Sequence, residues 1–315
     1  MNQRFIYYIY WEKFTCYLHF SLRRESAAES SLCFGSCKKA EEENVETTAI
    51  ITEKPTTPQL PSRLFCESCG RAKVTIPRIV GGTVASIREY PWLVFLHMRT
   101  SDDSFTCGGS LITRDYVLTA AHCVYGPLDS IYVYPFAHQY PDLESNDEYR
   151  IASAQVIVHE NYDDLEKRND IALVKLKEPV SFGRNVSSAC LANDDDMHTL
   201  AVVAGWGRLT HDDPLAIPEQ LMEVALEISD QEDCRSIYEG TVDITENMLC
   251  THTPGKDACV GDSGGPLLIE AGPNSWVQIG VVSFGAGCAG DAPGVYTRVS
   301  KYVDWIKSHV QKPNC

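Results

Sequence analysis

Short runs of β-branched and aromatic residues, separated by turn residues, make up most of the chain after Arg78. Examples are WLVFL, YVLTA, IYVYPF, AQVIVH, IALVKL, LAVVAGW, WVQIGVVSF and GVYTRV. Many short strands with Gly- and Pro-bearing turns are typical of an all-β sandwich or of β-barrels. Only the end differs, because apolar residues in SKYVDWIKSHVQK recur at three- and four-residue spacing, which predicts an amphipathic helix.

The first 78 residues have a different composition. Residues 25–63, with AEEENVETT and TEKPTTPQLPS, are rich in charge, threonine and proline, which predicts a poorly ordered linker. The apolar stretch FIYYIYW is interrupted by Glu12 and Lys13, so neither a standard signal peptide nor an apolar membrane span is visible. We therefore expect a leader or propiece of residues 1–78 and a folded domain of residues 79–315.

Cysteine content and charge narrow the class of protein. The chain has 13 cysteines, and their spacing matches no paired zinc-binding pattern, so disulfides in a secreted, extracellular protein are favoured. The formal net charge is −16, concentrated after the leader. This charge argues against nucleic acid as a partner and favours cationic ligands.

Three stretches contain candidate catalytic groups: His122 in TAAHC, Asp170 in NDIALVKL and Ser263 in GKDACVGDSGGP. Each is a weak signal by itself, because a lone histidine is usually structural, an aspartate before a strand is usually a cap, and a glycine-rich serine loop can be a simple turn. Their occurrence in this order, each at the edge of an apolar run, is much harder to obtain by chance.

The order His, Asp, Ser in these contexts resembles the trypsin-like serine proteases of the chymotrypsin family, from about residue 79 to residue 312. The resemblance implies an all-β fold of two packed six-stranded antiparallel barrels with a C-terminal α-helix, and an active site between the barrels. It implies that Ser263 is the nucleophile, that His122 is the general base and then the general acid, and that Asp170 holds the imidazole tautomer. The N–H groups of Gly261 and Ser263 would form the oxyanion hole. No cofactor is implied.

The same resemblance assigns a substrate pocket. Its residues are Asp257, Ser283, Phe284, Gly285 and Gly294. Asp257 would lie at the bottom of the pocket, and a buried carboxylate needs a cation, so we expect cleavage of proteins or peptides after Arg or Lys. Phe284 stands where the family usually has Trp, and Val260 stands where longer polar residues are frequent. The sequence therefore does not predict which substrate residues are preferred at positions other than the one that Asp257 would bind.

The stretch TIPRIVGGT contains a candidate activation site. Cleavage after Arg78 would create an α-amino group on Ile79, which the family places against the acid before the nucleophile, here Asp262. The buried ion pair would then order the active site. Pairing should raise the pKa of the amine, so its stabilisation is lost as the pH rises through that value. An activating protease is expected, although Arg78 is itself an acceptable substrate residue for self-activation.

The family pattern also implies disulfides. The implied pairs are Cys107–Cys123, Cys234–Cys250, Cys259–Cys288 and Cys69–Cys190, the last of which would keep the leader attached after activation. The sequence does not connect the remaining cysteines, which are Cys16, Cys33, Cys37, Cys66 and Cys315. A further family bridge is absent, because Ala201 and Ile269 occupy its two positions.

Two surface features and two alternatives complete the prediction. Asn185-Val-Ser matches a glycosylation acceptor. The acidic residues 142–148 lie where some relatives bind calcium, but Ala137 replaces one expected acid, so no metal is expected. A protease-fold binding protein without catalysis is the first alternative, although no triad member is lost. A digestive or venom enzyme is the second, and the cysteine-bearing leader instead favours a regulated zymogen with protein inhibitors.

Overall fold

The computed structural model describes residues 5–11, 14–20 and 35–39 by their backbone. It describes residues 65–72, 82–141, 149–193, 200–210, 213, 215–288, 290–310 and 313–315 with their side chains. Two compact units are present, Met1–Thr57 and Pro58–Cys315. The first contains an antiparallel sheet of β1 (Phe5–Trp11), β2 (Phe14–Phe20) and β3 (Gly35–Lys39). Strand β3 lies inside the stretch predicted to be a linker, because pairing with β2 gives its backbone groups hydrogen-bond partners.

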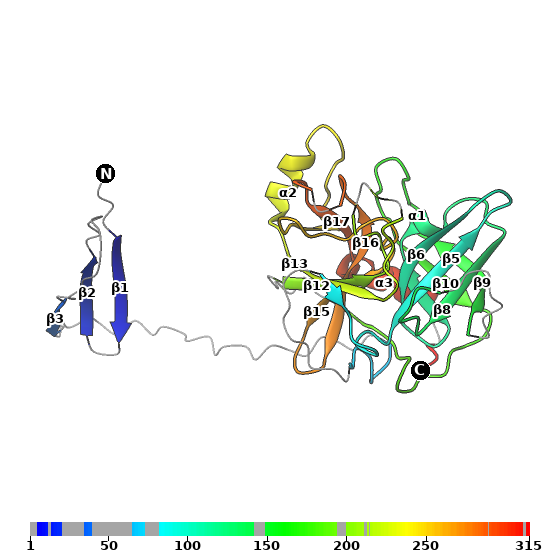
Figure 1. The fold of residues 1–315 in the computed structure, drawn as a ribbon, viewed down its shortest axis with the longest axis horizontal. Coiled ribbons are helices and arrows are strands. Elements are labelled where there is room, and N and C mark those ends of the chain that lie inside the picture. The colour runs from blue at the N-terminus through cyan, green and yellow to red at the C-terminus, as the bar shows by residue number, and fades with distance from the viewer. Residues whose placement is uncertain are drawn as a thin grey trace. The chain divides into compact units, whose positions relative to one another are not determined.

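Six strands of the second unit close into an antiparallel barrel (Figure 1). They are β5 (Leu93–Arg99), β6 (Ser104–Leu111), β7 (Tyr116–Thr119), β8 (Ser130–Pro135), β9 (Ile151–Val158) and β10 (Ala172–Leu176). Alternate residues of β5, namely Val94, Leu96 and Met98, are fully buried in one core with residues of β7 and β10. The other face of β5 is buried as well, because Leu93 and Phe95 lie in a second core with Trp206.

The second barrel follows in the chain. Its strands are β14 (Met248–Thr251), β17 (Gly294–Arg298), β16 (Trp276–Phe284), β15 (Pro266–Glu270), β12 (Leu200–Gly205) and β13 (Met222–Glu227), in that spatial order. A single bridge between Ile228 and Thr251 closes it, where the first barrel has a continuous ladder. Strand β4 (Thr83–Val84) extends β13, and β11 (Cys190–Leu191) pairs with β16. The predicted two-barrel all-β architecture is confirmed.

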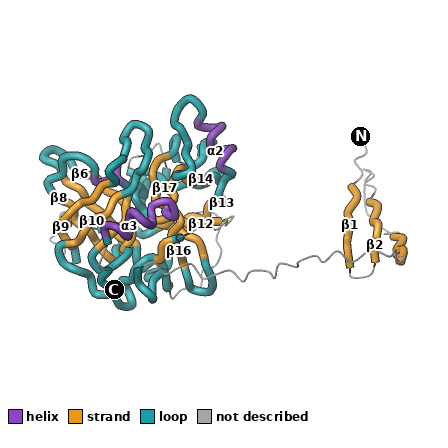
Figure 2. The backbone as a smooth tube through the Cα atoms, turned by 180° about the vertical axis from the view of Figure 1, so that it is seen from behind, coloured by secondary structure: helices purple, strands orange, loops and turns teal. Residues whose placement is uncertain are grey.

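Four short helical segments accompany the barrels. They are α1 (Ala121–Val124), α2 (Gln231–Tyr238), the 3-10 turn η1 (Val299–Tyr302) and α3 (Val303–His309). The predicted C-terminal helix is therefore shorter than its sequence pattern and starts as a 3-10 turn. Its apolar stripe is buried as expected, and it packs on a core that contains residues of both barrels (Figure 2). No helix in the described part of the chain is long and apolar enough to cross a membrane.

Residues 65–72, here called the leader strap, pack on the second barrel. The N–H of Gly70 donates to the carbonyl of Ser188 at 2.8 Å, and the N–H of Trp276 donates to the carbonyl of Gly70 at 2.8 Å. Five disulfides join described residues: Cys69–Cys190, Cys107–Cys123, Cys234–Cys250, Cys259–Cys288 and Cys66–Cys315. The first four are the pairs that the resemblance implied. The fifth ties the strap to the C-terminal residue.

Candidate active site

His122 and Asp170 meet at one end of the first barrel. His122 lies in α1, directly after β7, and Asp170 lies just before β10, which pairs with β7. Nδ1 of His122 is 2.7 Å from Oδ2 of Asp170, and the backbone N–H of His122 donates to Oδ1 at 2.9 Å. Two contacts to one carboxylate fix both the position of α1 and the orientation of the imidazole ring.

The second barrel supplies further partners of Asp170. The hydroxyl of Ser283 donates to Oδ2 at 2.5 Å, and the hydroxyl of Thr297 donates to the carbonyl of Asp170 at 2.7 Å. Burial alone raises the pKa of Asp170, but hydrogen bonds from His122 and Ser283 outweigh it and hold that pKa below its ordinary value. An ionised carboxylate only accepts, so the proton of the imidazole resides on Nδ1 and Nε2 is an acceptor.

The loop that carries Ser263 packs against the first barrel. The N–H of Gly108 donates to the carbonyl of Ser263 at 2.7 Å. Gly264 has φ +78°, and a Cβ there would lie 2.2 Å from Oγ1 of Thr119, at the end of β7 that leads to His122. Only glycine permits this approach. Within the described residues no hydrogen bond joins Ser263 to His122; in unliganded sites such contacts are often long.

Two backbone donors of this loop have no acceptor within the described residues. The N–H of Asp262 donates to Cys259 and the N–H of Gly265 donates to Asp262, both at 2.9 Å, so these groups are used within the turn. The N–H groups of Gly261 and Ser263 have no acceptor among the residues that the structure describes. Gly261 has φ +106°, a conformation that glycine adopts readily. The loop thus offers two donors to the oxygen of a ligand.

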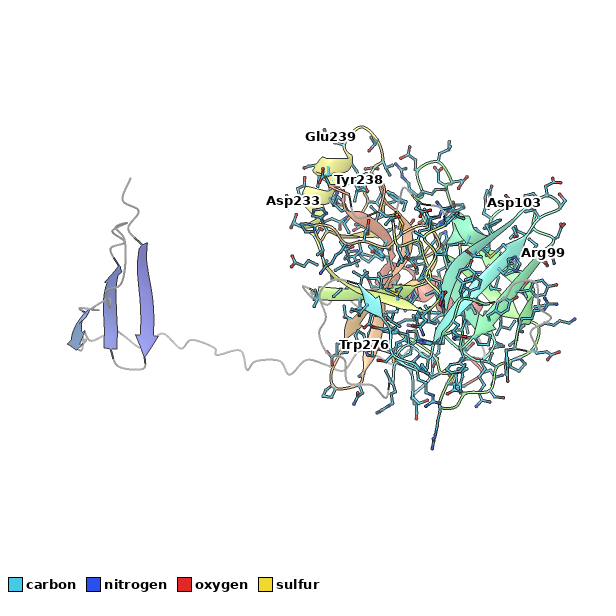
Figure 3. The ribbon with its side chains drawn as sticks, in the orientation of Figure 1. Arg99, Asp103, Asp233, Tyr238, Glu239 and Trp276 are labelled. Atoms are coloured by element: carbon cyan, nitrogen blue, oxygen red, sulfur yellow. A yellow bond between two sulfur atoms is a disulfide. The ribbon has the colours of Figure 1, made fainter. Side chains whose placement is uncertain are left out.

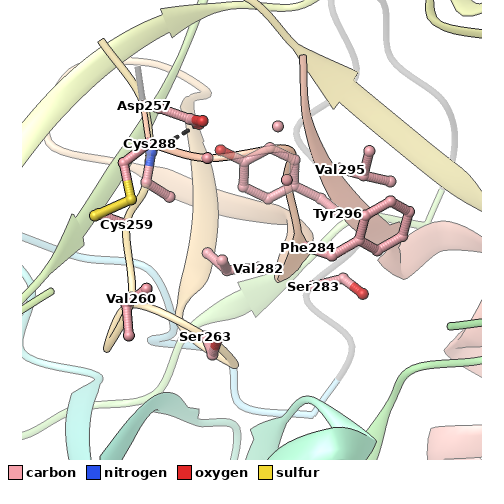
Figure 4. Close-up of a pocket in the computed structure, with 14 residues that line it drawn as sticks. Asp257, Cys259, Val260, Ser263, Val282, Ser283, Phe284, Cys288, Val295 and Tyr296 are labelled. Atoms are coloured by element: carbon pink, nitrogen blue, oxygen red, sulfur yellow. Dashed lines mark hydrogen bonds between the residues drawn. A yellow bond between two sulfur atoms is a disulfide. The ribbon is translucent and has the colours of Figure 1, made fainter. Parts of the chain in front are cut away.

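A pocket of about 220 Å³ connects Ser263 with Asp257. Ser263 lies at one end, Asp257 at the other, and Val282 between them (Figure 4). A Cβ on Gly294 would lie 2.6 Å from Oδ1 of Asp257, and one on Gly285 would lie 3.7 Å from its Oδ2. Because both neighbours are glycines, the carboxylate is reached from the pocket without obstruction by side chains.

The wall of this pocket includes Ser283 and Phe284. Phe284 packs edge-on against Tyr238 of α2, with ring centroids 5.8 Å apart, and the hydroxyl of Tyr238 donates to the carbonyl of Pro293 at 2.6 Å. Tyr238 was not predicted, although Cys234 and Tyr238, the buried residues of its helix, stand at the four-residue spacing of a helix face. Figure 3 shows Tyr238 at the end of the second barrel that is remote from Trp276.

A family model described as Trypsin matches residues 79–306. The chain belongs to the trypsin family of serine proteases. It is 37% identical to serine proteinase stubble of Drosophila melanogaster over 265 residues, which are 77% of this chain and 32% of that protein. It is 34% identical to Serine protease 28 of Mus musculus, with coverage of 80% and 96%, and 35% identical to the proclotting enzyme of Tachypleus tridentatus, with coverage of 84% and 74%. It therefore spans about a third of the first relative and most of the other two.

Asp262 of this trypsin-family protease does not line the pocket between Ser263 and Asp257. Its Oδ1 accepts the N–H of Gly207 at 2.7 Å, and its Oδ2 accepts the N–H of Cys259 at 2.9 Å. These two hydrogen bonds lower the pKa of Asp262, but burial has the larger effect and raises it to about 6. The side chain lines a cavity of about 500 Å³ together with Gly82. No cationic side chain in the described part of the chain forms an ion pair with it.

Several predicted features of the protease lie elsewhere. Arg78, Ile79 and the acidic segment 142–148 lie outside the described residues. Asn185 is half-buried, and its Oδ1 accepts a hydrogen bond from Nε of Arg88 at 2.7 Å, so Nδ2 is the atom to which a glycan would attach. One cluster of potential metal ligands is present in the described ranges, Cys107, His122 and Cys123. Its two sulfurs form a disulfide and cannot act as thiolate ligands.

Proposed function

We propose that the chain is the zymogen of a secreted serine endopeptidase that hydrolyses peptide bonds after Arg or Lys, and that cleavage between Arg78 and Ile79 activates it. The observation that supports this most strongly is the pocket with a carboxylate at one end and Ser263 at the other. A serine, an oriented imidazole and a cation-selective pocket in one cleft are what a protease of this specificity requires.

In the proposed mechanism Ser263 attacks the scissile carbonyl while Nε2 of His122 accepts the hydroxyl proton. Asp170 stays ionised and stabilises the imidazolium that forms. The N–H groups of Gly261 and Ser263 receive the developing oxyanion, and each such donor is typically worth about 3–4 kcal/mol of barrier. The imidazolium then protonates the leaving amine, and a water molecule repeats the sequence on the acyl-enzyme.

Specificity would come from Asp257. A guanidinium can form two parallel hydrogen bonds with a carboxylate, and an ammonium can form an ion pair with it. An apolar side chain in this pocket would displace water from the carboxylate without giving it a new partner, whereas a cation would compensate for the lost hydration. Arg and Lys are therefore the expected residues on the amino side of the scissile bond.

Activation would proceed through Asp262. The new ammonium of Ile79 would enter the cavity beside Gly82 and pair with this carboxylate, whose pKa would then fall. The ion pair would hold the Gly261–Ser263 turn in its donor-presenting form. The disulfides Cys69–Cys190 and Cys66–Cys315 would keep the leader attached to the activated enzyme. Five disulfides also favour an oxidising, extracellular compartment.

The test of this function uses chain cut at Arg78 by an added protease and verified by amino-terminal sequencing. Peptide substrates with Arg, Lys or Phe before the scissile bond are compared for the parent and for Asp257→Ser. We expect the Arg and Lys substrates to lose about a thousandfold or more in kcat/KM, as expected when a site is left with an unmatched buried partner. Asp233→Ser, on the exposed surface of α2, is the matched control and should change nothing.

Two outcomes would contradict the proposal. Equal cleavage of Phe and Arg substrates by the parent would remove the assigned specificity. Failure of a phosphonofluoridate reagent to label Ser263 in the cut chain, with Ser263→Ala as the blank, would instead favour a silent binding protein.

A further inference from the structure

Glu223 of β13 contacts two side chains of the segment that follows the activation bond. Its Oε1 accepts a hydrogen bond from the hydroxyl of Thr83 at 3.4 Å, and its Oε2 accepts a short one from the hydroxyl of Tyr90. Thr83 and Glu223 are also register partners where β4 pairs with β13. One carboxylate therefore joins the start and the end of the segment from Thr83 to Tyr90.

Tyr90 is a fixed donor to this carboxylate. Its side chain is 4% exposed and packs edge-on between Trp92 and Trp276, with ring centroids 6.3 and 5.9 Å away. Burial, and after it the charge of Glu223, raises the pKa of the phenol well above its ordinary value. The phenol thus keeps its proton, and the rings on either side hold it against Glu223.

The turn between these two contacts has its own restraint. The N–H of Ala85 donates to the carbonyl of Leu221 at 2.9 Å, which continues the pairing of β4 with the second barrel. Oε2 of the buried Glu89 accepts the N–H of Ser86 at 2.7 Å. Because the turn between them is restrained, the hydrogen bonds of Glu223 to Thr83 and Tyr90 help to fix the position of Thr83.

Gly82, Glu223 and Asp262 line the same cavity. Only three residues separate the amino group of Ile79 from Gly82 along the chain, and three extended residues span at most about 11 Å. The point at which the chain leaves β4 therefore decides whether the new amino terminus reaches Asp262.

We propose that Glu223 is a positioning residue for activation: by holding Thr83 and Tyr90, it sets the point from which the amino group of Ile79 enters the cavity of Asp262. This inference rests on the proposed activation by cleavage after Arg78. The proposal adds a second carboxylate, Glu223, to the activation site. Glu223 does not contact the amine of Ile79, but its loss would make insertion of that amine less favourable.

The experiment measures insertion directly, as the rate at which cyanate carbamylates the Ile79 amine in cut chain, alongside kcat/KM for an Arg substrate. Glu223→Met removes both acceptors, and Tyr90→Phe removes the main donor while keeping the packed ring. Glu223→Gln, which restores an acceptor, should recover part of the effect. Glu227→Met is the matched control, because it lies on the same strand but outside the pairing with β4.

Loss of a hydrogen bond to a charged group should raise the carbamylation rate about tenfold and lower kcat/KM by about the same factor in Glu223→Met and Tyr90→Phe. Glu227→Met should match the parent. Equal protection of the amine in the parent and both variants, with the uncut forms unfolding at the same temperature, would overturn the role of Glu223. A parent whose amine reacts as fast as that of a free peptide would instead overturn the activation proposal itself.

Discussion

Between about pH 4 and 7, Asp262 should make stability depend on pH before cleavage at Arg78 but not after it. In the uncut chain burial raises the pKa of this carboxyl from 3.8 to about 6. At 1.36 kcal/mol per pKa unit, the charged form costs the folded state about 3 kcal/mol. This figure is a ceiling, because the side chain lines a cavity that water can enter.

The sign follows from proton binding. The unfolded chain releases this proton near pH 4 and the folded uncut chain near pH 6, so the folded state binds more protons in between. Its free energy of unfolding therefore falls as the pH rises through that window. After cleavage, the proposed ion pair with the Ile79 ammonium should lower the pKa of Asp262 below its unfolded value. The ion pair then stabilises the fold above the unfolded pKa, until the amine deprotonates at alkaline pH.

The assay is urea unfolding of the parent and of Asp262→Asn, both carrying Ser263→Ala to prevent self-digestion, in uncut and cut chain. Asparagine leaves the N–H of Gly207 or Cys259 without its acceptor, which is a penalty of about 1–3 kcal/mol that does not vary with pH. The stability of the parent minus that of the variant is therefore compared at two pH values. Between about pH 4.5 and 7.5 it should fall by about 2 kcal/mol in uncut chain and stay nearly constant in cut chain, where the carboxylate is already ionised in both the folded and the unfolded state. A fall of the same size in both forms would refute the reasoning.

Three further substitutions test the site. Ser283→Ala removes a hydrogen bond to the charged Asp170 and should lower kcat about tenfold with little change in KM, measured by steady-state kinetics on an Arg substrate. Gly294→Ala places a methyl group 2.6 Å from Oδ1 of Asp257 and should raise KM for that substrate at least about tenfold, while serine-directed labelling persists. Cys66→Ser should cost about 2–4 kcal/mol of stability in urea unfolding, yet the cut leader should stay attached on a non-reducing gel.

Local sequence predicted most strands because short apolar runs of β-branched and aromatic residues, bounded by turn residues, are typical of buried strands, and it predicted the C-terminal helix from its three- and four-residue spacing. All eight runs named from the sequence lie on or overlap strands of the barrels. Two elements were not predicted. Strand β13 reads MEVALE, which favours a helix by propensity, but pairing with β12 and β4 makes it a strand. Helix α2 was overlooked because it is short, although Asp230 caps its first turn and its buried residues Cys234 and Tyr238 are four positions apart.

The sequence by itself determined the fold class, the candidate triad, the acidic pocket floor and four of the disulfide pairs, because these follow from short motifs and from a family resemblance. It did not pair Cys66 with Cys315, which are 249 residues apart, and it assigned Ser283 only to substrate binding. It also gave no reason to single out Glu223 or Tyr90. These contacts join residues more than 100 positions apart, and they exist only where the two barrels and the leader strap pack together. Motifs specify which chemical groups a chain contains, whereas packing decides which distant groups come within hydrogen-bonding distance.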